Sequence, residues 1–260
     1  MIEEFKINSK TVFFSSKNNG GGIWFGQDYI HYLKHRYPDR VFDDCLEWCA
    51  GPGFIGYSIL DSGICNNLTL LEKHAEACED AIKTQLFPDN DWKDKVNIVH
   101  CDTVKNLEGK FDLIVSDPPF YDETMTRAYR SNPDVERIAI DVGWKSHKDF
   151  FSNIKKNLKE DGIILLFACA EPEGLTLPKA EKILEGSGLK ITDYFKDLIF
   201  KYTNHLRMET KASGKEYESV YAWKIPEVLS KIPEGIEDAI QEQYDYHFLP
   251  SLHIIELRHE

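Results

Sequence analysis

Residues 114–121 read IVSDPPFY and place a carboxylate, two prolines and two aromatic rings directly after an apolar stretch. The apolar and β-branched residues before Asp117 are typical of an interior strand. Because proline has no amide hydrogen and forces the preceding residue into extended backbone, the strand must end at Asp117. The motif therefore holds a carboxylate, carbonyl oxygens and ring faces on a stiff turn. Asp-Pro and Pro-Pro also occur in turns that only end a strand, so this stretch alone leaves both interpretations open.

A second candidate site is the stretch LEWCAGPGFIG at 46–56, where a predicted strand runs into a glycine turn and then a helix. Such a turn lets the backbone approach a ligand closely, with the helix amides facing it. Glu72 ends the next predicted strand, nineteen positions after Gly53. An acid at this spacing is where α/β nucleotide sites hold the ribose hydroxyls. Glu72 would also be favourable as an acid at a helix start, but the combined spacing favours the ribose role.

The elements around these motifs alternate between strand and helix. The pattern predicts strands at 41–49, 68–72, 96–102, 111–117 and 163–169, and helices at 53–63, 73–87, 145–162 and 178–188. A strand is also predicted at 11–16, before this alternation begins. Two further strands, 189–203 and 218–226, have no helical pattern between them and favour an antiparallel hairpin at the sheet edge. Strands this apolar, each followed by a helix, predict a sheet covered on both faces. We therefore expect an α/β, doubly wound fold with a mostly parallel seven-stranded sheet, an antiparallel C-terminal hairpin and helices on both faces.

Composition limits the class of protein. The 260 residues carry a net charge of −13 at pH 7, which repels polyanions and makes nucleic acid an unlikely partner. The longest apolar run, IILLFACA at 163–170, is too short to span a bilayer, and the charged opening does not resemble a signal peptide. The six cysteines include no CxxC pair, and the nine histidines show no metal-ligand spacing. We expect a cytoplasmic protein with no metal and no membrane partner.

The stretches DDCLEWCAGPGFIG, LTLLEKH, VHCD and FDLIVSDPPFY resemble successive motifs of the Rossmann-like, S-adenosylmethionine-dependent methyltransferases. The resemblance covers roughly residues 41–170, in the family's order and spacing. Its most specific part, Asp-Pro-Pro-Phe, is similar to the (Asn/Asp)-Pro-Pro-(Tyr/Phe) motif of enzymes that methylate planar nitrogens on adenine, cytosine or glutamine side chains. The resemblance implies S-adenosylmethionine as the cofactor and N-methyl transfer as the activity.

The resemblance also implies how the cofactor is held. Glu47 would lie near its methionine part, Glu72 would hold the ribose hydroxyls, and Asp102 would accept a hydrogen bond from the adenine amino group. The stretch 25–27, FGQ, weakly resembles a segment that reaches over the methionine end, or is an ordinary helix start. The full set of expected cofactor-binding residues is Gln27, Glu47, Cys49, Gly51, Gly53, Glu72, Lys73, Asp102, Thr103 and Asp117.

The glycine turn departs from the family in two places. Cys49 stands where the family usually has its first glycine, and Pro52 lies between Gly51 and Gly53. We expect both residues to be tolerated provided that their φ angles are negative.

The implied chemistry explains the stiff turn after the fourth strand. Methyl transfer from a sulfonium needs a nucleophile in line with the methyl carbon, so positioning should dominate. An amide or aryl amine nitrogen is a poor nucleophile because its lone pair is delocalised. Hydrogen bonds from its N–H groups to the Asp117 carboxylate and the Pro118 carbonyl would favour the tetrahedral, nucleophilic state. Phe120 is the expected stacking ring, and Tyr121 could supplement or replace it.

The expected acceptor is a protein side chain or a small metabolite. The chain is acidic, and its last residues do not resemble a DNA-recognition domain. We expect residues 1–40 to cover the cofactor or substrate, 41–226 to form the catalytic domain and 227–260 to form a C-terminal extension. Three alternatives stay open: an adenine-N6 nucleic-acid methyltransferase, an enzyme that cleaves or cyclises S-adenosylmethionine without a methyl acceptor, and a non-catalytic cofactor-binding partner subunit. The intact Asp-Pro-Pro-Phe argues against the last, and the oligomeric state is left open.

Overall fold

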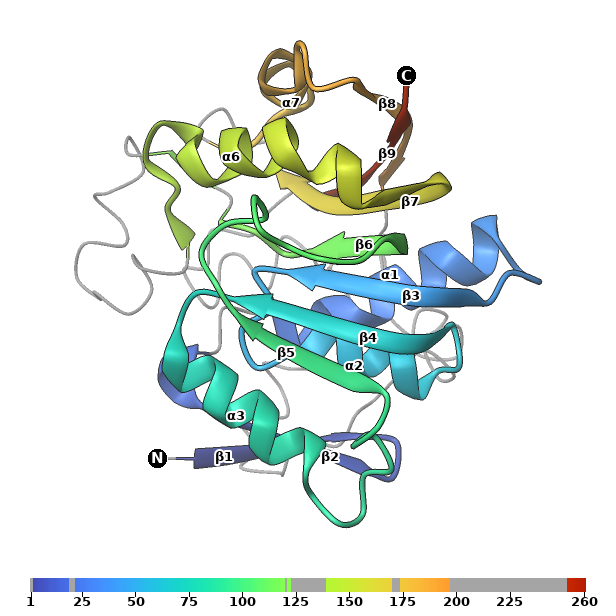
Figure 1. The fold of residues 1–260 in the computed structure, drawn as a ribbon, viewed down its shortest axis with the longest axis vertical. Helices are drawn as coiled ribbons and strands as arrows, with labels where there is room; N and C mark the ends of the chain where they lie inside the picture. The colour runs from blue at the N-terminus through green and yellow to red at the C-terminus, as the bar shows by residue number, and fades with distance from the viewer. Residues whose placement is uncertain (1, 19–21, 120, 123–138, 170–173, 197–251) are drawn as a thin grey trace, which may run out of the picture.

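The core of the protein is a seven-stranded sheet with the order β5-β4-β3-β6-β7-β9-β8 (Figure 1). The computed structural model describes residues 2–18, 22–119, 121–122, 139–169, 174–196 and 252–260. Strands β3 to β7 pair in parallel, whereas β9 is antiparallel to both of its neighbours. The strands are β3 (Phe42–Trp48), β4 (Cys65–Glu72), β5 (Val96–His100), β6 (Phe111–Ser116), β7 (Leu158–Cys169), β8 (Leu189–Lys196) and β9 (Leu252–His259). The predicted α/β fold with a mostly parallel sheet is confirmed.

Helices cover both faces of this sheet, and the pleat decides which strand residue meets which helix (Figure 1). Leu113 and Val115 of β6 pack in one apolar cluster with α1 and α2, while Ile114 between them packs in a second cluster with α6 and α7. The helices are α1 (Gly22–Arg36), α2 (Phe54–Asp61), α3 (Ala75–Gln85), α6 (Lys145–Asn153) and α7 (Leu177–Leu184). Among the described residues, none of the helices has the length and apolarity that crossing a membrane would need.

A separate hairpin of β1 (Ile2–Ile7) and β2 (Lys10–Ser15) packs beside α3 (Figure 1). Side chains accept hydrogen bonds from alternate amides of β2, as a neighbouring strand would. The Thr11 amide donates to Asn90 Oδ1 (2.9 Å), and the Phe13 amide donates to Thr84 Oγ1 (2.9 Å). The Ser15 amide donates to Asp80 Oδ2 (2.7 Å). The sequence predicted β2 at 11–16, but the earlier strand β1 was not predicted.

The antiparallel edge of the sheet differs from the prediction in one strand. β8 falls within the predicted strand 189–203, but its partner is β9 and not the predicted strand 218–226, which lies outside the described residues. β9 is inserted between β7 and β8. The sequence had assigned Leu252–His259 to a C-terminal extension at 227–260, and the structure places this part of the range within the sheet.

Glu256 explains why β9 is hard to recognise as an interior strand. This acid is 2% exposed and interrupts the apolar pattern of the strand. Its carboxylate accepts hydrogen bonds from the hydroxyls of Tyr32 (2.9 Å) and Tyr37 (2.5 Å) on one oxygen. Thr192 Oγ1 (3.0 Å) and Arg258 Nε (2.8 Å) donate to the other oxygen. Four donors make a buried carboxylate tolerable, but only the tertiary structure brings them together.

Strand β7 begins earlier than predicted and contains a bulge. The sequence predicted a helix at 145–162 ended by Gly162, but α6 ends at Asn153 and β7 starts at Leu158. The pairing shifts between Phe111↔Leu158 and Leu113↔Ile163. A Cβ atom on Gly162 would lie 2.9 Å from the Lys159 carbonyl oxygen and 3.0 Å from that of Phe111. Glycine is therefore needed inside the strand by close backbone approach, and not as a helix terminator.

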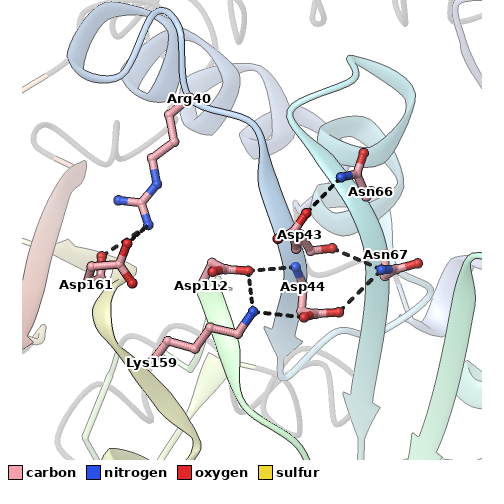
Figure 2. Close-up of polar contacts among 8 residues, drawn as sticks. All are labelled: Arg40, Asp43, Asp44, Asn66, Asn67, Asp112, Lys159 and Asp161. Atoms are coloured by element: carbon pink, nitrogen blue, oxygen red, sulfur yellow. Dashed lines mark hydrogen bonds and ion pairs between the residues drawn. The ribbon is translucent and has the colours of Figure 1, made fainter.

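A polar network ties the amino ends of β3, β6 and β7 together, as Figure 2 shows. Lys159 Nζ lies 3.0 Å from Asp44 Oδ2 and 2.9 Å from Asp112 Oδ2. The Asp44 amide also donates to Asp112 Oδ2 (2.8 Å). Burial raises the pKa of Asp112, but the Asp44 amide and Lys159 outweigh it, so the net pKa is lowered. This edge of the sheet is opposite the carboxyl ends of the parallel strands, where the candidate motifs lie.

Replacing Gly162 by alanine should destabilise the protein by about 1–3 kcal/mol, because the new methyl group would overlap two backbone carbonyls. Asp161→Ala is the matched control at the neighbouring position. It removes only the Arg40–Asp161 ion pair, whose aspartate side chain is 78% exposed, and should change stability by less than about 0.5 kcal/mol. Urea unfolding of both variants measures the difference, and equal midpoints would contradict a steric requirement for glycine.

Candidate cofactor and acceptor site

The glycine turn between β3 and α2 is built from residues with left-handed backbone. Gly51 and Gly53 have φ of 53° and 88°, and a Cβ atom on Gly53 would lie 2.7 Å from Leu70 Cδ1. A Cβ atom on Gly51 would meet only the carbonyl oxygen of Asn18, at 3.8 Å. Gly53 is therefore fixed by packing, whereas Gly51 has space beside it. That space is what a turn requires if a ligand is to approach its backbone.

Cys49 also has a left-handed backbone, with φ of 56°. The condition of a negative φ is therefore not met at this position, and Cys49 is accommodated with a left-handed backbone. Pro52 meets the expectation, because its ring fixes φ near −65°. The conformation of Cys49 explains why a glycine is usual at this position of the motif, since a side chain costs about 1 kcal/mol there. Burial raises the pKa of the Cys49 thiol, with Glu72 as a further cause, so the thiol is held protonated.

Gly56 is a functional position that the sequence analysis missed. Its amide donates to Glu47 Oε2 (2.8 Å), and a Cβ atom here would lie 2.7 Å from that same oxygen. The signal was present, because residues 51–56 read G-x-G-x-x-G and the third glycine serves close packing of helix on strand. Glu47 is 2% exposed, and burial raises its pKa to about 8 although the Gly56 and Ile55 amides oppose this. The structure shows Glu47 holding the start of α2; its expected contact with the cofactor stays a prediction.

Glu72 lies at the end of β4 and connects that strand to the glycine turn. Oε2 accepts a hydrogen bond from the Gly51 amide and Oε1 accepts one from the His74 amide, both at 2.8 Å. A carboxylate has about four acceptor positions, so roughly one on each oxygen remains for two ribose hydroxyls. The free acceptor positions of Glu72 and the space beside Gly51 fit the two hydroxyls of the S-adenosylmethionine ribose.

The remaining predicted cofactor residues follow β4 and β5. The Cys101 amide donates to the Glu72 carbonyl (2.9 Å), which places the exposed Asp102 beside the end of β4. Lys73 is exposed. Thr103 has a structural partner, because its hydroxyl donates to Asp149 Oδ2 (2.6 Å) on α6. Gln27 lies in α1, and its side chain lies outside the described part of the structure.

The carboxyl end of β6 holds Asp117 beside the cofactor strand β3. Ser116 is paired in register with Trp48, and its hydroxyl donates to the Trp48 carbonyl (2.5 Å). The Tyr29 hydroxyl donates to the Ser116 carbonyl (2.5 Å). Asp117 Oδ1 is buried and has no hydrogen-bond partner among the described residues. Burial raises the pKa of Asp117 well above its ordinary range, and the charge of Glu47 raises it further.

The described residues that follow Asp117 are buried in part, and the rigidity of this turn stays a prediction. Pro118 and Pro119 are buried. Phe120, the expected stacking ring, lies outside the described residues. Tyr121 is 2% exposed within the apolar core, and its amide donates to the Ala139 carbonyl (3.1 Å). The structure thus gives Tyr121 a packing role, and its role as a stacking ring stays a prediction. Within the described part of the chain, no group of three or more His, Cys, Asp or Glu residues could hold a metal ion.

Comparison with known proteins supports the fold and the cofactor. Residues 30–133 match the model of the family described as the Methyltransferase small domain. The fold and the cofactor are those of the S-adenosylmethionine-dependent methyltransferases. The crystal structure of the glycopeptide N-methyltransferase MtfA superposes with a TM-score of 0.52, covering 90% of each chain at 13% identity. At that identity the superposition supports the fold alone.

Two curated relatives match over shorter stretches. The ribosomal protein uL3 glutamine methyltransferase of Francisella tularensis is 30% identical over 126 residues, 46% of this chain and 40% of its own length. The ribosomal RNA small subunit methyltransferase C of Actinobacillus pleuropneumoniae is 30% identical over 169 residues, 65% of this chain and 44% of its own length. This chain therefore spans less than half the length of both relatives.

Glu72→Ala should weaken S-adenosylmethionine binding by about 1–3 kcal/mol, because it removes the ribose acceptor and releases the Gly51 amide. Asp102→Ala should also weaken binding without lowering the melting temperature, because Asp102 is exposed. Titration calorimetry and thermal unfolding of both variants separate the two effects. Wild-type protein that is folded but shows no saturable binding would contradict the assignment of the cofactor site.

Proposed function

We propose that this chain transfers the methyl group of S-adenosylmethionine to a planar nitrogen of a protein side chain or a small metabolite. The observation that carries the proposal is the buried Asp117 Oδ1, which has no partner among the described residues and lies at the end of β6. A buried carboxyl oxygen without a donor is costly, so its retention suggests that a ligand supplies the donor. We call residues 117–119 the acceptor turn.

The placement of the acceptor turn supports methyl transfer to nitrogen. β3 and β6 are adjacent and parallel, so Cys49 and Asp117 leave the sheet side by side. S-adenosylmethionine supplies an electrophilic methyl group on a sulfonium when it is bound at the glycine turn. An acceptor amide or amine would donate its N–H groups to the Asp117 carboxylate and the Pro118 carbonyl. These hydrogen bonds strengthen as the nitrogen becomes tetrahedral, so they stabilise the transition state more than the flat ground state.

The class of acceptor follows from charge and from the relatives. The net charge of −13 opposes a polyanion and favours a basic protein or a small molecule. Of the two relatives, one is named for a ribosomal protein glutamine and the other for ribosomal RNA. A nucleic-acid acceptor is therefore the second candidate, and it rests on the names of the relatives, several of which are ribosomal RNA small subunit methyltransferases C.

Asp117→Ala, which removes the accepting oxygens, should lower turnover by about 100-fold or more while leaving S-adenosylmethionine affinity nearly unchanged. The pH profile gives a second measurement. Because the carboxylate is the accepting form and its pKa is raised, kcat/KM should fall as the pH drops through that pKa and rise above it. The variant should lack this acid limb. Wild-type turnover in Asp117→Ala would remove Asp117 from catalysis.

The acceptor can be found with S-adenosylmethionine carrying a labelled methyl group. Cell extract incubated with enzyme and fractionated by size should show label in protein or in small molecules. A gel shift at near-physiological salt should show no retention of duplex DNA or structured RNA. Label in nucleic acid, or tight and salt-sensitive binding, would favour the second candidate. Cofactor consumption that yields methylthioadenosine and no labelled acceptor would favour cleavage or cyclisation of the cofactor over methyl transfer.

A further inference from the structure

A carboxylate–imidazole pair is buried at the start of α6. The His147 side chain is fully buried, and its Nδ1 lies 2.7 Å from Asp141 Oδ2. Asp141 also accepts hydrogen bonds from the backbone amides of Ser146 (3.0 Å) and His147 (3.1 Å). Burial raises the pKa of Asp141, but His147 and these amides outweigh it, so the net pKa lies below the ordinary value. Asp141 is therefore a carboxylate, and Nδ1 of His147 is the nitrogen that donates.

The backbone of Asp141 is tied to the residues that follow the acceptor turn. Its amide donates to the Tyr121 carbonyl (2.8 Å). Two residues further on, the Gly143 amide donates to Asp122 Oδ1 (2.8 Å). Tyr121 and Asp122, which follow the acceptor turn in the chain, are thus anchored to the segment that carries Asp141. The carboxylate of Asp141 in turn anchors that segment to α6.

His147 also packs against the cofactor strand. Its ring lies 5.5 Å from the ring of Trp48, at an interplanar angle of 87°. Phe150, three residues later in α6, stacks on the same indole at 4.0 Å and 13°. Trp48 ends β3, and its carbonyl accepts the hydrogen bond from Ser116. Asp141 and His147 therefore connect β3, which precedes the glycine turn, to the residues that directly follow the acceptor turn.

Two energetically unfavourable features lie beside Asp141 and His147. They indicate that the geometry of this pair matters more than efficient packing. Trp144 adopts a left-handed φ of 56°, which a bulky residue adopts only where the surroundings impose it. Nε2 of His147 is buried without a hydrogen-bond partner among the described residues. An apolar side chain of similar size would avoid that second cost.

We propose that Asp141 and His147 form a positioning pair, which fixes the acceptor turn relative to the cofactor strand and so acts on methyl transfer through Asp117. The proposal rests on the proposed function, because it concerns the placement of the group that accepts from the substrate. Neither residue is assigned a contact with the acceptor. A misplacement of about 1 Å can cost 100-fold in rate, so such a pair can control turnover without touching the substrate.

Two substitutions separate positioning from packing. Asparagine at position 147 places an amide N–H near the position of the histidine Nδ1 and can still donate to Asp141. Leucine fills the space but cannot donate. We expect His147→Leu to lower kcat per folded molecule by about tenfold or more, with the dissociation constant for S-adenosylmethionine changed less than about twofold. His147→Asn should restore kcat to within about threefold of wild type. The assay is methyl transfer into the labelled acceptor fraction.

Amide hydrogen exchange of the ligand-free protein gives a readout that needs no acceptor. The Tyr121 and Asp141 amides should exchange about tenfold faster in His147→Leu and at nearly the wild-type rate in His147→Asn. Equal kcat in wild type and both variants, or equal loss in both without rescue, would overturn the positioning role. If His147→Leu does not fold, Asp141→Asn replaces it, and wild-type exchange and kcat there would overturn the role equally. Asp117→Ala in the same assay tests the proposed function separately, because full activity of that variant leaves the exchange result standing.

Discussion

Carboxyl groups at one edge of the sheet must leave water, and the cost of that burial governs the candidate site. Glu47 and Glu72 are buried, and backbone amides from Gly56, Gly51 and His74 offset part of that cost. The glycine turn takes its shape because these amides have to point at the two acids. Asp117 differs from these two acids, because no described residue donates a hydrogen bond to its buried Oδ1. Two acids thus build the turn, and the third is left with hydrogen-bonding capacity for a ligand.

At the opposite edge of the sheet, charged side chains have a structural role only. There Lys159 bridges Asp44 and Asp112, so each charge has a partner and solvent is close by (Figure 2). Ion pairs of this exposed kind add little stability individually. Their main effect is to set the alignment of β3, β6 and β7 at the amino end. The same strands then deliver their carboxyl ends to the site in a fixed relation.

Local patterns predicted those parts of the fold that local chemistry determines. β3, β4 and β6 were predictable because apolar runs end at a glycine turn, an acid or two prolines. The glycine turn, Glu72 and Asp117 were predictable because motif and spacing coincide. β9 was not predictable, because Glu256 is acceptable in a strand only beside partners that lie far away in the sequence. The role of Gly162 likewise depends on a contact between two strands, and the backbone of Cys49 departs from what its side chain prefers.

The insertion of β9 between β7 and β8 has a consequence for the order of events during synthesis. Among the described strands, β8 pairs only with β9, so none of them can pair with β8 during synthesis until Leu252–His259 has emerged. Glu256 then bonds to Tyr32, 224 positions earlier in the chain, and such distant contacts form slowly. Until then β7 presents an open edge of the kind that recruits foreign strands. The nascent chain is open to misassembly in this interval, and the pairing of β9 with β7 ends it.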